Sequence, residues 1–315
     1  MATRKIVQHG SSSLTITLPI KWINKNKLHK GDEIQIVEEG HYLIVGGRGR
    51  KEILSKTITV SDKISCPTIM HYTAALYRAG YDHIEFAYNN AEIYNAIDKV
   101  VGSDLNGLDI TENKKNFCVL ESISMIDQSQ FKSILKKLLF SLSEFSKDSL
   151  ESIKTKNINE IKMAMTKESI INRNANFCER ILTKVGYEDI DQIPFLFYII
   201  KELENIGDEY YSICKYYLKQ KKIDKKTLKL FKETNDSFTN FKNLFLKQET
   251  EKALKIEDCS KLHSEIQEKT KELYSSLEAN DKDDCILHHL CSIIRRIKSC
   301  LGSLFSIMIV REEEK

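Results

Sequence analysis

The chain contains few residues that interrupt secondary structure, and it has no long apolar run. Its 315 residues include three prolines and twelve glycines, so helices can extend over many turns without a breaker. The most apolar stretches, 193–200 and 301–310, are much shorter than the roughly 20 residues that span a bilayer. We therefore expect no membrane insertion, and the polar N-terminus gives no indication of a signal peptide.

Charge and cysteine spacing exclude further classes of protein. The formal net charge is +3, which is too small for a global attraction to nucleic acid, so any basic patch must be local. The eight cysteines form no C-x-x-C pair, which indicates reduced thiols packed inside a cytoplasmic protein. The sequence lacks G-x-S-x-G, H-E-x-x-H and a phosphate-cradling glycine loop, and we expect that it is not an enzyme.

The first 47 residues have the pattern of a small β unit within a chain long enough for two or three domains. Apolar and polar residues alternate over 14–18 and 33–37, as in half-buried strands, and 41–45 closes a hairpin with the second of these. A helical turn is expected over 20–26. The apolar set is too small to be stable alone, so we expect two copies to pair as a homodimer.

This N-terminal segment resembles the AbrB/SpoVT/MazE swapped-hairpin domain. The matching features are the G-S-S loop at 10–12, the T-L-P-I-K-W motif at 17–22 and the K-G-D-E-I turn at 30–34. The resemblance implies an intertwined homodimer that contacts DNA through Arg4, Lys5, Ser11, Ser12, Lys21, Lys25 and Lys27. Arginine would read guanine, whereas lysine and serine would position the DNA backbone. Alternatively, these lysines form a solvated rim and the hairpin serves only for dimerisation.

Residues 48–127 indicate a small α/β connector domain. The expected elements are strand 56–60, helix 67–79 closed by Gly80, strand 83–87, helix 91–101 and strands 109–111 and 116–120. The connector in archaeal PhoU-like regulators is similar, because an A-G-Y-D sequence recurs there and here occupies Ala79–Asp82. We expect His71 and His83 to be structural or surface residues, since neither has an acid or cysteine at ligand spacing.

From residue 128 onward, apolar residues recur at helical spacing, and we expect an all-α region. The six long helices begin near residues 131, 157, 194, 227, 256 and 283. Two sets of three suggest an internal duplication, with one lobe at 128–222 and a second, degenerate lobe at 223–315.

The third helix carries the most informative residues. Glu204 and Asp208 are four residues apart, so both lie on one helix face, an arrangement that suits a hard or borderline cation. Gly207 between them costs about 1 kcal/mol in a helix, so another helix is expected to approach closely there. The hexapeptide Leu203–Asp208 resembles the L-E-R-I-G-D motif of PhoU proteins.

The PhoU resemblance implies a metal site and a role in phosphate uptake. It implies a divalent or ferric metal ion in the first lobe, held by Glu204, Asp208 and Glu168. Asn172 stands where the family's D-x-x-I-D pattern has a second acid, and the counterpart motif in the second lobe, Ile294–Ser299, has no carboxylate. The alternative is a solvated acidic face without a metal.

Cysteine and histidine residues of the last two helices form a second constellation. Antiparallel neighbours could bring Cys259, His263, Cys285 and His289 together as a zinc set, whereas the alternative is that the cysteines pack in the core. A cationic group, Arg295, Arg296 and Lys298, could bind an anion or an acidic partner. A carboxylate-bridged metalloenzyme would need Glu-x-x-His pairs, and none of the acids singled out above belongs to one.

Together these patterns predict a multidomain α+β protein: an N-terminal swapped-hairpin domain at 1–47, an α/β connector at 48–127 and two three-helix PhoU-like repeats. The expected function is that of a cytoplasmic, homodimeric, DNA-binding transcriptional regulator linked to phosphate uptake. The rival from another class is an interaction protein that regulates a phosphate transporter or signalling complex. Salt dependence separates the two, because DNA contacts through several cations weaken steeply with salt.

Overall fold

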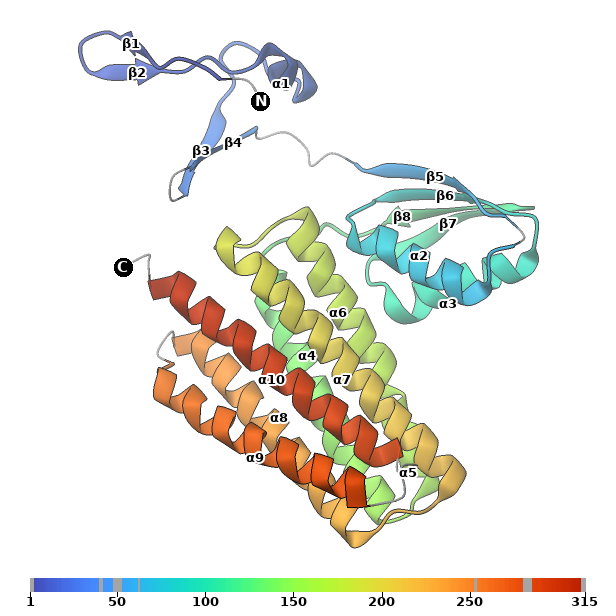
Figure 1. Cartoon of the computed structure of the whole chain (residues 1–315). Helices are drawn as coiled ribbons and strands as arrows, with labels where there is room; N and C mark the ends of the chain where they lie inside the picture. The colour runs from blue at the N-terminus through green and yellow to red at the C-terminus, as the bar shows by residue number, and fades with distance from the viewer. Residues whose placement is uncertain are drawn as a thin grey trace. The chain divides into compact units, whose positions relative to one another are not determined.

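The computed structural model describes residues 3–39, 42–47, 53–61, 63–251, 254–279 and 285–312. The chain divides into two compact units, residues 1–53 and 54–315. It is a mixed α+β protein in which helices predominate, and the strands that the structure describes lie between residues 7 and 122 (Figure 1). In the described ranges, no helix has both the length and the apolar character needed to cross a membrane.

The first unit contains two separate antiparallel hairpins and one short helix. Strand β1 (Val7–His9) pairs with β2 (Ser13–Thr15), and β3 (Ile34–Glu39) pairs with β4 (Tyr42–Gly47). Helix α1 (Ile20–Lys25) lies between the hairpins in sequence. The expected helical turn and second hairpin are confirmed. The strand expected over 14–18 ends at Thr15, because its partner β1 is only three residues long.

The second unit begins with a four-stranded sheet covered on one face by two helices (Figure 1). The strands are ordered β5 (Ser55–Thr59), β6 (His83–Ala87), β8 (Phe117–Ser122) and β7 (Leu108–Lys114). β5 is parallel to β6, and the other neighbours are antiparallel. With α2 (Cys66–Arg78) and α3 (Ala91–Asp104), this element order confirms the α/β pattern expected from the sequence.

Local capping explains where these two helices begin and end. The Ser65 hydroxyl accepts a hydrogen bond from the Thr68 amide at the start of α2, and the Asn90 side chain accepts one from the Glu92 amide at the start of α3. Gly80 follows α2 with a φ of 90°, a left-handed conformation that favours glycine. The predicted role of Gly80 in closing the helix is therefore confirmed.

The remainder of the second unit is a helical bundle. Its helices are α4 (Gln130–Lys154), α5 (Ile158–Met165), α6 (Lys167–Lys184), the 3₁₀ turn η1 (Ile190–Gln192), α7 (Ile193–Gln220), α8 (Lys225–Glu251), α9 (Ile256–Ala279) and α10 (Cys285–Glu312). Helix α7 packs along α10, so it joins the earlier and later helices of the bundle (Figure 1). The predicted connection at Asn280–Asp281 lies outside the described residues.

One expected helix is in fact two. The helix predicted from Asn157 to Leu182 breaks at Thr166, which ends α5 and begins α6. The Thr166 hydroxyl and amide both donate to the carbonyl of Met163, which tightens the last turn of α5. The apolar spacing continues across this break, so periodicity alone could not reveal it.

Candidate functional site

The seven side chains predicted to contact DNA are all exposed in the first unit. Lys21 and Lys25 are one turn apart on α1, so they share a helix face. Lys27 follows the helix with a φ of 51°, in the left-handed region. These three cations therefore gather at one short helix and its C-terminal turn.

The other predicted contacts lie at the first hairpin. Arg4 and Lys5 precede β1, and Ser11 and Ser12 occupy the turn that connects β1 to β2. Gly10 opens this turn with a φ of 74°, a conformation that costs little without a Cβ. The turn presents both serine hydroxyls to solvent.

The side chains that the structure describes in the first unit form no hydrophobic core. Among the side chains that the structure describes in residues 3–46, none is buried. Seven large apolar side chains are more than half exposed: Ile6, Val7, Leu14, Ile16, Ile20, Ile36 and Leu43. Such a number of exposed apolar side chains is unusual for one small unit of a soluble monomer.

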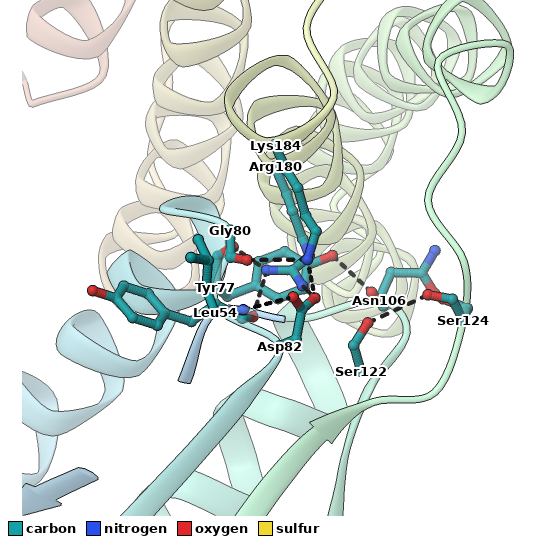
Figure 2. Close-up of polar contacts among 10 residues, drawn as sticks. Leu54, Tyr77, Gly80, Asp82, Asn106, Ser122, Ser124, Arg180 and Lys184 are labelled. Atoms are coloured by element: carbon teal, nitrogen blue, oxygen red, sulfur yellow. Dashed lines mark hydrogen bonds and ion pairs between the residues drawn. The ribbon is translucent and has the colours of Figure 1, made fainter. Parts of the chain in front are cut away.

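A polar junction joins the α/β module, residues 54–122, to the helical bundle (Figure 2). Two cations of α6, Arg180 and Lys184, reach the C-terminal end of α2 and the turn after it. Their acceptors are the carbonyl oxygens of Tyr77, Gly80 and Tyr81 and the carboxylate of Asp82. The carbonyls at a helix C-terminus lack intrahelical partners and attract cations, so α6 caps α2.

Arg180 is the central residue of this junction. Its side chain is 1% exposed, it pairs with Asp82 at 2.9 Å, and its guanidinium lies 4.6 Å from the centre of the Tyr77 ring. Asp82 also accepts a hydrogen bond from the Leu54 amide at 3.2 Å. The Ala79–Asp82 sequence that resembles PhoU-like connectors thus forms the α2 cap and the carboxylate partner of α6.

Helix α6 caps α3 in the same way. Arg173 donates to the carbonyls of Gly102 at 2.7 Å and Ser103 at 2.9 Å. The Asn176 amide donates to the carbonyl of Asp104 at 3.1 Å. One face of α6 therefore holds the ends of both helices of the α/β module.

The three predicted metal ligands lie near this junction. Glu168 is on α6, and Glu204 and Asp208 are on α7. A Cβ added to Gly207 would lie 3.1 Å from Ile171 Cγ2 of α6, which confirms the close helix approach expected at this glycine. This packing brings the three carboxylates into electrostatic contact, and Asp104 at the end of α3 joins them.

Burial and mutual repulsion make these acids harder to ionise. Desolvation, followed by the negative charges of Glu204 and Glu168, raises the pKa of Asp208 to about 6. Desolvation also raises the pKa values of Glu168 and Asp104, and nearby carboxylates add to the effect. Glu179, 2% exposed on α6, has its pKa raised to about 7 mainly by burial, despite the neighbouring Arg78.

The geometry of this acidic set does not fit a metal ion. Among the residues that the structure describes, no three His, Cys, Asp or Glu side chains are grouped so that they could hold one. The Asn172 amide donates to Glu168 at 2.7 Å, and Lys201 forms an ion pair with Glu204. Protein donors therefore occupy carboxylate oxygens that a metal would need.

The alternative zinc set is wrong. The Cys259 thiol contacts the sulfur of Met308 at 3.9 Å, whereas His289 Nδ1 lies 2.6 Å from Glu209. Met308 and His289 are nineteen residues apart on α10, a separation of about 28 Å along a helix. Cys259 therefore packs in the core, far from the histidine.

The cationic group of α10 is partly neutralised within the chain. Arg296 pairs with Glu202 at 3.0 Å and Glu209 at 3.4 Å. Burial opposes ionisation of Glu209, but hydrogen bonds from His289 and Ser292 outweigh it and lower the pKa of Glu209. Arg295 and Lys298 are exposed, so only these two retain the solvent access that the predicted anion or partner site needs.

His83 has acidic neighbours that the sequence interpretation missed. Its two ring nitrogens each lie 3.1 Å from a carboxylate oxygen, one of Glu85 and one of Glu121. These hydrogen bonds, led by that of Glu85, raise the pKa of His83. Glu85 could have been identified, because residues two apart share a strand face. Glu121 required the strand register, in which it pairs with His83.

No protein-family model matches this chain, and neither the curated proteins nor the solved structures contain a significant match.

Proposed function

We propose that the chain is a DNA-binding transcriptional regulator that acts as a homodimer through its first unit. The observation that carries this proposal is that none of the unit's described side chains is buried, while seven large apolar ones are exposed. Full burial of one such side chain contributes about 1.5–3 kcal/mol, so packing two copies against each other supplies a strong driving force. A second copy is a suitable partner because it presents the same surface.

The distribution of charge supports DNA as the ligand. Residues 1–53 contain nine Lys and Arg against five Asp and Glu, whereas the other 262 residues contain 39 against 40. The whole positive excess therefore belongs to the first unit, and pairing two copies doubles it. A local cationic surface of this kind attracts the phosphates of a duplex.

The larger unit is assigned the sensing or docking role. In this proposal its α/β module is the connector, and α4–α7 and α8–α10 are the two PhoU-like repeats. The link to phosphate uptake rests on the resemblance of Ala79–Asp82 and Leu203–Asp208 to the PhoU-like motifs. The ion-paired junction supports a mechanical connection between the bundle and the module.

Binding to a fluorescent duplex at several salt concentrations tests the proposal. We expect affinity to fall steeply with salt, with a log–log slope of about −0.9 for each phosphate contact. K21Q/K25Q should weaken binding and flatten this slope. The matched control K136Q/K137Q, which removes two exposed lysines of α4, should leave both unchanged.

The opposite result favours the rival function. A dimer that binds no duplex at low salt, or whose binding is equally insensitive to both double variants, would mean that the first unit only dimerises. The helical region would then dock on a phosphate transporter or signalling complex.

A further inference from the structure

Lys201 stands within the motif that resembles a metal site. It lies three residues before Glu204 and seven before Asp208 on α7, so the three share one helix face. Its ammonium forms an ion pair with Glu204, whose side chain is only 14% exposed. A fixed positive charge therefore sits beside the carboxylates that a metal would neutralise.

The charge of Lys201 reaches beyond its direct partner. It lowers the pKa values of Asp208 and Glu179, and so acts against the burial that raises them. These acids come from both α6 and α7. The one ammonium thus interacts electrostatically with three carboxylates, those of Glu204, Asp208 and Glu179. The Asn172 amide donates a hydrogen bond to Glu168 at 2.7 Å.

We propose that Lys201 is an internal counter-ion that takes the place of a metal at this acidic set, with the Asn172 amide holding Glu168. A divalent cation would have to displace the ammonium from Glu204 and then remain close to it, at a large electrostatic cost. Hard cations also need six or more oxygen ligands, and two of the carboxylates already have protein donors. The bundle therefore keeps its helices together here without a bound metal. This inference is independent of DNA binding.

Titration of the full-length protein with Mn²⁺ tests the proposal, because the electron paramagnetic resonance signal of free Mn²⁺ is lost on binding. The unaltered chain and K201R should bind no Mn²⁺ at this set. K201Q should gain at least about tenfold in Mn²⁺ affinity, since it removes the competing charge. N172D should add to that gain in the double variant but have little effect while Lys201 remains.

Two controls locate the effect. K215Q removes an exposed lysine of the same helix and should change nothing. K201Q/E204Q should lose the gain of K201Q. Thermal melting of each variant checks that the fold is retained, as expected for a lysine that is 44% exposed.

Two results would overturn the proposal. One is Mn²⁺ binding by the unaltered chain that E204Q or D208N abolishes. The other is a folded K201Q/N172D variant with no more affinity than the unaltered chain. Neither outcome depends on whether the protein binds DNA.

Discussion

At the scale of single residues, Arg180 makes several of the contacts that connect the bundle to the α/β module. Its guanidinium is buried, pairs with Asp82 and donates to two carbonyls near the end of α2. We expect Arg180→Ala to lower the free energy of unfolding by about 1–3 kcal/mol, because it leaves those carbonyls without this donor. Lys184 and the Leu54 amide still contact Asp82 in this variant. Urea unfolding measures this loss.

A matched variant in the same junction tests whether the burial of Arg180, and not only its hydrogen bonds, determines the loss of stability. Arg173 makes two hydrogen bonds to the end of α3 but is exposed, so Arg173→Ala should cost about 0.5–1.5 kcal/mol. Equal losses for the two variants would contradict the assignment of Arg180 as the main contact.

Glu179 gives a prediction about pH. Its pKa in the folded protein is about 7, above the ordinary 4.5, so the folded state binds this proton more tightly than the unfolded state does. Its contribution to stability is therefore greatest at low pH and is lost as pH rises through about 7. Glu179→Gln removes the titration, so the variant should gain about 1–3 kcal/mol relative to the unaltered protein between pH 5 and pH 8.

Urea unfolding at pH 5, 6, 7 and 8 follows this difference. Glu144→Gln, at an exposed position, is the control. Its free energy of unfolding should differ from that of the unaltered protein by the same amount at every pH. A difference in the free energy of unfolding that is also independent of pH for Glu179→Gln would rule out a raised pKa of Glu179.

Single residues were predictable only where the cause was local. The glycine penalty at Gly207 indicated a close helix approach, and the structure places Ile171 there. The pairing of Asp82 with Arg180 was not predictable, because 98 residues separate them and no pattern in the sequence couples the two. The pairing of Lys201 with Glu204 has a local cause, because residues three apart share a helix face, so the sequence alone was sufficient to predict it.

At the scale of elements, the buried serines of α4 set how closely its neighbours approach. Ser143, Ser146 and Ser149 recur every third residue and are at most 1% exposed. The carbonyl of Ser146 accepts a hydrogen bond from Asn235 of α8, which in turn accepts one from the Tyr210 hydroxyl of α7. Short side chains let three helices share this buried polar network.

Enlarging one of these serines should separate the helices. We expect Ser146→Leu to destabilise the protein by about 1–3 kcal/mol through overpacking and loss of the network geometry. Ser133→Leu, on the exposed face of α4, should stay within about 0.5 kcal/mol. Thermal melting compares the two, and an equal shift would show that α4 tolerates bulk on either face.

Element types were easier to predict than their ends. Apolar periodicity indicated the α/β order and the long helices, since it reports which face is buried. It did not indicate the break at Thr166, where the side chain and amide both turn back to Met163. Nor did it give the register of β8 against β6, which brings Glu121 beside His83.

At the scale of the whole molecule, the proposed homodimer is predicted to depend on apolar side chains of the first unit. Leu14 and Ile36 are 71% and 60% exposed, so Leu14→Asp and Ile36→Asp should weaken the dimer by at least about tenfold each. Sedimentation velocity over a range of concentrations measures the dissociation constant. Met125→Asp changes a position that is 95% exposed in the larger unit. This control variant should leave the dissociation constant of the dimer unchanged.

The capping of α2 and α3 by a single helix has a mechanical consequence. Arg173 and Arg180 are seven residues apart on α6, or two turns, so the helix grips the module at two points rather than one. A tilt of α6 would therefore move α2, α3 and their sheet together with it. A partner bound to this sheet would restrict the motion of α6, and a change in the orientation of α6 would change the orientation of the sheet.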